Sequence, residues 1–137
     1  MKYWLLKSEP SEYGWDDLVA EKEGCWDGVR NYAARNFMRE MEAGDLCFFY
    51  HSQKERAIVG IARVTAPAFP DPTDESGRFV AIKLQPVRQL ERAISLSVVK
   101  ADQRLQQMPL VRQPRLSVQP VTKTEFAILE ELAAHEQ

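Results

Sequence analysis

Apolar and polar residues follow one another along this chain in short blocks, and their spacing predicts both strands and helices. Continuous apolar runs at residues 3–6 and 46–50 are typical of strands that are buried on both faces. Residues 58–64 are rich in β-branched side chains and contain Gly60, which suggests a bulge or a close backbone approach. Residues 80–85 alternate apolar and polar, as a half-buried strand does.

Two helices are predicted in the first third of the chain. Residues 15–21 follow Gly14, a permissible cap, and carry acidic side chains in their first turn, where the helix dipole favours them. Residues 31–41 place apolar side chains at positions i, i+3, i+4 and i+7, which is the stripe of an amphipathic helix. Asn31 is placed to cap this second helix.

The remainder of the chain predicts a loop, two further helices and an irregular segment. Residues 66–77 contain three prolines and predict a loop, and Pro86 is unlikely in a central strand unless the strand bends or bulges there. Residues 97–105 predict a short helix, and residues 110–121 are irregular or strand-like. The pattern of residues 122–125 matches a capping box that begins a final helix reaching Ala133.

These elements add up to a single domain that covers residues 1–137. The order of strands and helices predicts an α+β fold, with a sheet of about five strands surrounded by short helices. The chain contains neither an internal repeat nor a linker long enough to separate two domains.

Composition excludes several classes of protein. Hydrophobic residues make up 45% and charged residues 28%, which is ordinary for a globular protein and not for a fibrous or disordered one. We find no run of about 18 apolar residues that would span a bilayer and no signal-peptide pattern. Cys25 and Cys47 are too few for a disulfide framework. We therefore expect a soluble, cytoplasmic protein with reduced cysteines and no contact with a membrane.

The net charge of -2 argues against a protein that binds nucleic acid through bulk charge. The charge is unevenly distributed, however. Residues 1–77 carry 9 basic and 14 acidic side chains, residues 78–123 carry 9 basic and 2 acidic ones, and residues 124–137 carry 4 acidic ones. The basic middle segment is compatible with a surface that faces phosphates, although on charge alone a solvated face is the better interpretation.

Common enzyme and metal motifs are absent from the sequence. The six glycines form neither a dinucleotide fingerprint nor a phosphate-binding loop. The histidines are His51 and His135, and no recognisable ligand spacing surrounds either one, so we expect no metal and no cofactor. Cys47 and His51 share one side of a regular strand, but a period of two arises often by chance, and a structural role is the better interpretation.

Three segments, residues 7–10, 26–36 and 50–52, combine the residue types that hold a flat, polar, aromatic ligand. An aromatic face for stacking is available from Trp26 or Tyr50. Phosphates would need basic side chains such as Lys7, Arg30 and Arg35. Polar groups for the edge of a base come from Ser8, Glu9, Asp27, Asn31 and Asn36.

Each of these residues also has a simpler interpretation. Trp26 is equally compatible with a core tryptophan beside a tight turn. Asn31 suits a helix cap, His51 suits a partly buried structural histidine, and Arg35 suits an exposed ion pair of little energetic value.

The same segments resemble the successive motifs of the EVE domain family. The matching stretches cover almost the whole chain in order; they are residues 3–10, 26–36, 44–45, 49–52, 59–64, 69–72 and 116–118. One departure is Gly14, which stands where a serine cap is usual. It touches the start of a helix and leaves the candidate pocket unaffected.

This resemblance implies a PUA-like fold, a small mixed β-barrel flanked by helices and related to the YTH and ASCH domains. It also implies a reader of modified bases, with modified cytosine in DNA as the ligand of the eukaryotic members. We therefore expect non-catalytic binding of a modified nucleobase in DNA or RNA; the sequence leaves the oligomeric state open between a monomer and a weak dimer. The base would stack on Trp26, with Tyr50 or Phe49 opposite. The expected ligand-binding residues are Lys7, Ser8, Glu9, Trp26, Asp27, Gly28, Val29, Arg30, Asn31, Arg35, Asn36, Tyr50, His51 and Ser52.

Two other functions are compatible with the sequence. The alternative is an enzyme that acts on modified nucleosides or nucleotides, as ASCH-like relatives do, through Lys7, Glu9 and His51. A third interpretation is a protein-interaction module that uses the basic segment 78–123.

Overall fold

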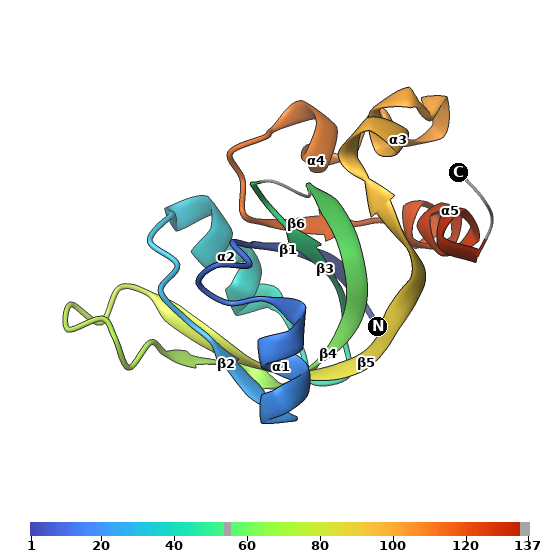
Figure 1. Ribbon diagram of the computed structural model, residues 1–137. Coiled ribbons are helices and arrows are strands. Elements are labelled where there is room, and N and C mark those ends of the chain that lie inside the picture. The colour runs from blue at the N-terminus through green and yellow to red at the C-terminus, as the bar shows by residue number, and fades with distance from the viewer. Residues whose placement is uncertain (54–55, 135–137) are drawn as a thin grey trace.

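A six-stranded mixed sheet with the order β2-β5-β4-β3-β1-β6 forms the centre of the molecule (Figure 1). The computed structural model describes residues 1–53 and 56–134, and His135, one of the two histidines, lies outside the described residues. The strands are β1 (Tyr3–Ser8), β2 (Gly24–Trp26), β3 (Leu46–His51), β4 (Ala57–Pro70), β5 (Val80–Ser95) and β6 (Val118–Val121). Strands β1 and β3 pair in parallel, and the other pairings are antiparallel.

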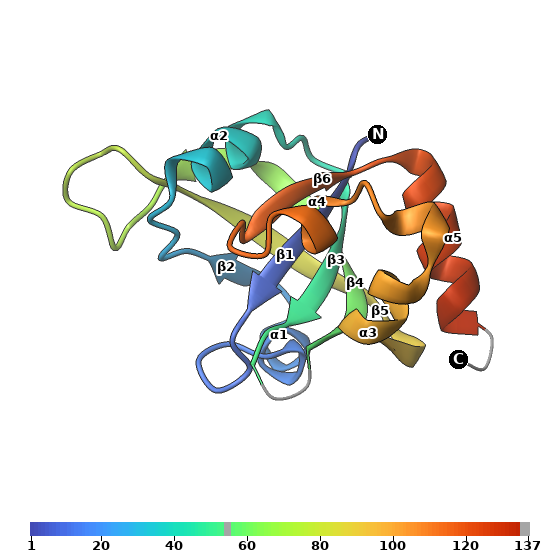
Figure 2. The ribbon, with the colours of Figure 1, turned by 90° about the horizontal axis from the view of Figure 1, so that it is seen from above.

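The helices cover both faces of this sheet. They are α1 (Trp15–Glu21), α2 (Tyr32–Glu40), α3 (Leu96–Ala101), the 3-10 turn Gln103–Leu105, α4 (Pro109–Arg112) and α5 (Lys123–Ala134). Helices α1 and α2 lie on one side, whereas α3, α4 and α5 lie on the other (Figures 1 and 2). The predicted capping box holds the start of α5, because Thr122 and Glu125 each accept a hydrogen bond from the backbone N–H of the other.

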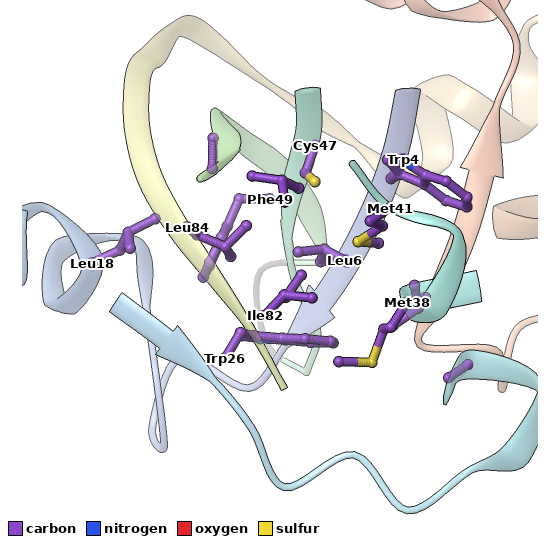
Figure 3. Close-up of a cluster of buried hydrophobic side chains, with 14 of the residues drawn as sticks. Trp4, Leu6, Leu18, Trp26, Met38, Met41, Cys47, Phe49, Ile82 and Leu84 are labelled. Carbon is purple, nitrogen blue, oxygen red and sulfur yellow. The ribbon is translucent and has the colours of Figure 1, made fainter. Parts of the chain in front are cut away.

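Strands β1 and β3 are buried on both faces, as their apolar runs predict. Trp4, Leu6 and Phe49 belong to the core beneath α1 and α2, whereas Leu5 and Phe48 belong to the core beneath α3 to α5. Figure 3 shows side chains of the first core gathered around β1, β3 and β5. Because successive residues of a strand point to opposite faces, a continuous apolar run serves two cores at once.

The structure corrects the expected sheet in two respects. It has six strands, because the three-residue β2 pairs with Ile82–Leu84 of β5 and was missed in the sequence. The sheet also stays open and forms no barrel, since within the described residues β2 and β6 stand at its two ends without pairing to each other.

Prolines shift the boundaries of β4 and β5. Residues 66–70, predicted as loop, continue β4 and pair with β5 across register shifts between Val64 and Phe69. Pro86 also lies at a register shift in the pairing of β4 with β5. On the other side of β5, over the described residues, β2 pairs only with residues 82–84. Pro86 therefore occupies an unpaired edge of β5, where a proline is tolerated. The loop begins at Asp71 and projects from the sheet in both views (Figures 1 and 2).

Gly60 allows the Trp15 side chain to approach the backbone of β4 closely, as a glycine within a strand suggested. A Cβ atom at this position would lie 2.6 Å from two ring atoms of Trp15. Trp15 is buried, and its ring packs edge-on against Phe49. The glycine therefore lets α1 pack directly on the sheet.

We expect Gly60→Ala to lower the free energy of unfolding by about 1–3 kcal/mol, because the added methyl group overpacks the Trp15 ring. Chemical denaturation measures this loss. A double-mutant cycle with Trp15→Leu supplies the control, since the cost should shrink when the ring is absent. An equal cost in both backgrounds would contradict the contact.

Candidate functional site

A hollow of about 510 Å³ lies at the ends of β1 and β2, and its volume falls in the range of small-ligand sites. We call it the acidic hollow, for the charges described below. Eight predicted residues line it, namely Lys7, Ser8, Glu9, Trp26, Asp27, Gly28, Val29 and Arg30. The motifs after β1 and around β2 therefore converge in space, although they lie some twenty residues apart in sequence.

Trp26 forms both a wall of this hollow and a part of the core. Its side chain is only 6% exposed. In Figure 3 its indole lies across the lower edge of the core, next to Ile82, Leu6 and Met38. The core interpretation of Trp26 is therefore confirmed, and its stacking on a base stays a prediction.

Carboxylates outnumber free cations in the lining of this hollow. Glu9, Glu12 and Asp27 line it, whereas the guanidinium of Arg30 is held 3.0 Å from the carboxylate of Asp71. The amine of Lys7 stands at one wall and donates a hydrogen bond of 2.8 Å to the carbonyl of Pro114. The hollow consequently favours groups that donate hydrogen bonds.

Asp71 fixes the loop that forms one wall. Its buried carboxylate accepts hydrogen bonds from the Gly28 N–H, from Arg30 and from both the N–H and the hydroxyl of Thr73. Burial by itself raises the pKa of Asp71, but the hydrogen bonds from Thr73, Gly28 and Arg30 outweigh it and lower the pKa below its usual range. This one side chain ties the projecting loop after β4 to the loop between β2 and α2.

Other predicted residues have structural partners elsewhere. The Asn31 side chain caps α2 by accepting a hydrogen bond of 2.9 Å from the Ala34 N–H, which confirms the simpler interpretation. Arg35 donates hydrogen bonds to Asn36 and to the carbonyl of Arg78. These three residues do not line the acidic hollow, and a role for them in binding stays a prediction.

The predicted residues at the end of β3 are also separated from the acidic hollow. His51 accepts a hydrogen bond of 3.0 Å from the Trp15 N–H, while Tyr50 and Ser52 line a neighbouring hollow. Phe49 is fully buried against Trp15 and His51. Neither Tyr50 nor Phe49 lies opposite Trp26 in the acidic hollow.

Four residues of the lining were not predicted from the sequence. These are Glu12, Tyr13, Cys25 and Ser117. The Tyr13 hydroxyl occupies the space above Gly24, 2.0 Å from where a Cβ atom would stand. Glu12 and Tyr13 follow the Ser8–Pro10 motif closely enough to have been found, but Ser117 reaches the site only through the pairing of β6 with β1.

Neither cysteine is activated. Burial raises the pKa of the Cys25 thiol, and the charges of Asp27 and Asp71 add to the effect. Burial also raises the pKa of Cys47. Among the described residues no cluster of histidine, cysteine and acidic side chains is suited to a metal ion, and none of their helices is long and apolar enough to cross a membrane.

Solved structures show the class of fold to which this chain belongs. The YTH domain of a Zygosaccharomyces rouxii protein, solved with N6-methyladenosine RNA, superimposes with a TM-score of 0.64 at 15% identity and covers 99% of this chain and 88% of that one. At this identity the likeness concerns the fold alone. The molecule is thus an open-sheet α+β domain with the fold that the YTH domain also has, in keeping with the PUA-like expectation.

The chain belongs to the EVE domain family, whose model matches residues 2–132. Thymocyte nuclear protein 1 of Mus musculus is 36% identical over 158 residues, which cover 90% of this chain and 70% of that protein. A Rhodopseudomonas palustris protein solved by NMR has a TM-score of 0.92 at 43% identity, with 98% and 94% of the two chains covered. The human THYN1 protein, crystallised in complex with 5-methylcytosine-containing DNA, has a TM-score of 0.90 at 35% identity over 100% of both chains.

We expect Asp71→Asn to lower the free energy of unfolding by about 2–4 kcal/mol near pH 7, because it weakens several hydrogen bonds to a buried carboxylate. The folded-state pKa of Asp71 is lowered, so its contribution is complete above the unfolded value of about 4 and is lost as the pH falls below that. Urea unfolding at neutral and acid pH measures the difference between variant and parent.

Glu75→Gln is the matched control, since Glu75 is exposed in the same loop. A stability difference for Asp71→Asn that stays constant down to pH 3 would contradict the role of the ionised carboxylate.

Proposed function

We propose that this protein binds nucleic acid by holding one modified base in the acidic hollow without catalysing a reaction on it. Methylated cytosine is the first candidate for that base. The observation that carries the proposal is the convergence of Trp26 with the carboxylates of Glu9 and Asp27 around a space of about 510 Å³. A flat ring with an exocyclic amino group matches such a lining. The relative crystallised with 5-methylcytosine-containing DNA, similar over the full length of both chains, supports the choice of base.

Carboxylates at the wall favour cytosine on chemical grounds. The N4 amino group of cytosine donates hydrogen bonds, and aspartate or glutamate is its usual acceptor in proteins. A base can meet these groups only after it has left the helical stack, or when it is presented in a single strand. Glu9 and Asp27 are both exposed to solvent, and within the described residues Asp27 accepts only a long 3.8 Å contact from the Cys25 thiol. An entering base can therefore reach both carboxylates.

The contacts around the hollow favour binding over catalysis. The hydroxyl of Ser8 donates to the carbonyl of Tyr13 instead of facing a general base. The raised pKa of Cys25 keeps its thiol protonated near neutral pH, and a thiol is a poor nucleophile. His51, named for the enzyme alternative, accepts a hydrogen bond from the Trp15 backbone. Burial lowers the pKa of Lys7, the third group with a part in the enzyme alternative, but its amine donates a hydrogen bond to the Pro114 carbonyl.

We expect Glu9→Gln and Asp27→Asn each to weaken binding of a methylated oligonucleotide by about tenfold, since a good polar contact to a base is worth about 1–3 kcal/mol. Fluorescence anisotropy with matched methylated and unmethylated duplexes measures the loss. Glu40→Gln, exposed on α2, is the charge-matched control.

The interpretation fails if both hollow variants bind the methylated duplex as tightly as Glu40→Gln does. Incubation with modified nucleosides, followed by mass spectrometry, distinguishes the enzyme alternative, which requires a product.

We expect Trp26→Ala to weaken binding by about tenfold to more than a hundredfold, because the stacking of a base on an aromatic side chain is worth about 1–3 kcal/mol. Removing a buried tryptophan also costs about 3–5 kcal/mol of stability. The assay is therefore accompanied by a thermal unfolding curve and by Trp26→Phe, which keeps an aromatic face. A folded Trp26→Ala variant with unchanged affinity would exclude stacking.

A further inference from the structure

A second hollow, of about 350 Å³, lies beside the acidic hollow and has the opposite charge. Three basic side chains line it, those of Lys7, Arg56 and Lys100. Among the described residues no carboxylate lines it, and none forms an ion pair with these three side chains. We call it the basic hollow; its other lining residues are Tyr50, Ser52, Gln53, Leu96, Leu110 and Pro114.

Lys7 is the wall that the two hollows share. It lines both of them, and its amine lies 5.8 Å from the centre of the Tyr50 ring. Along β1, Lys7 points to the face opposite that of Ser8, so the end of this one strand separates the two spaces. A strand of nucleic acid whose base enters the acidic hollow would therefore have its backbone beside Lys7.

Backbone contacts hold the rest of the basic hollow in place. The Arg56 carbonyl accepts a hydrogen bond of 2.8 Å from the Leu96 N–H, which joins Arg56 to the beginning of α3, the helix that carries Lys100. The Ser52 N–H donates a hydrogen bond of 2.9 Å to the Ser8 carbonyl, which joins the segment after β3 to the end of β1. The positive charges thus come from three separate elements and are brought to one space by these contacts.

The charges indicate what this hollow would bind. Three cations around one space repel one another, and an anion bound between them relieves that repulsion. Tyr50 lies within reach of this charge: burial raises the pKa of its hydroxyl, and the positive charge of Arg56 opposes that rise. Phosphates are repelled by the carboxylates of the acidic hollow, so the basic hollow is the adjacent place for them.

We propose that Arg56 and Lys100, together with Lys7, form a subsite for the phosphodiester backbone of the same strand whose base occupies the acidic hollow. This subsite rests on the proposed function and extends it: one hollow reads the base, and the other holds the backbone. Arg30 and Arg35, the arginines that the sequence suggested for phosphates, are already engaged by Asp71 and by Asn36 with the Arg78 carbonyl.

The test measures binding of matched methylated and unmethylated DNA over a range of salt concentrations. We expect Arg56→Gln and Lys100→Gln each to weaken binding about tenfold at about 0.1 M salt and to reduce the slope of log affinity against log salt by about 0.9. Contacts to phosphate carry no sequence information, so both duplexes should lose the same factor. Arg56→Lys keeps the charge and should keep the slope.

Arg63→Gln is the matched control. Arg63 is exposed and pairs with Leu46 at the start of β3, on the order of 13 Å along the strand from Tyr50. Both test residues are exposed as well, so all variants should unfold thermally as the parent does. The same series of variants with single-stranded RNA distinguishes whether the phosphodiester backbone of DNA or that of RNA binds in the basic hollow.

The outcomes separate the subsite from the base pocket. A double variant that matches Arg63→Gln in affinity and salt slope would overturn the subsite, while a preserved preference for methylated DNA would support the base pocket. A double variant that changes this preference instead of the overall affinity would also overturn it. Loss of affinity in the double variant, with no preference in the parent, would support the subsite and refute the base pocket. A parent that binds neither DNA nor RNA would refute both.

Discussion

The parallel pairing of β1 with β3 is the constraint on which the rest of this structure depends. Both strands are buried on both faces, so the pair divides the molecule into two cores and places helices on each side. At its end the pair passes from apolar to polar residues. Lys7 and Ser8 then point to opposite faces, and a hollow opens on either side of the strand. The core and the candidate site are thus consequences of one alternation along the chain.

Separation of charge explains how a chain with a net charge of -2 would approach a polyanion. Carboxylates gather where a base would donate hydrogen bonds, and cations gather where phosphates would lie. The charge summed over the sequence hides this arrangement because it averages two neighbouring spaces of opposite sign. Affinity for DNA would then be modest and sensitive to salt, and selectivity would come from the acidic hollow. Buried Asp71 adds rigidity by holding the wall of that hollow.

Local patterns predicted most elements of the fold. The apolar runs located β1 and β3, the i, i+3, i+4 stripe located α2 with its Asn31 cap, and the capping box located the start of α5. The failures involve long-range pairing. Strand β2 is only three residues long and exists because β5 pairs with it. Residues 66–70 are strand despite two prolines, because bulges in the pairing with β5 accommodate them.

The sequence by itself determined the family, the residue types of the site and eight residues of the acidic hollow, since motifs at the ends of strands gather at one rim. Only the tertiary structure decided which charges remain available. Arg30 is neutralised by Asp71, forty-one positions away, whereas Arg56 and Lys100 face a shared space with Lys7. Sequence spacing carries no information about such encounters, because they depend on how separate elements pack against a common sheet.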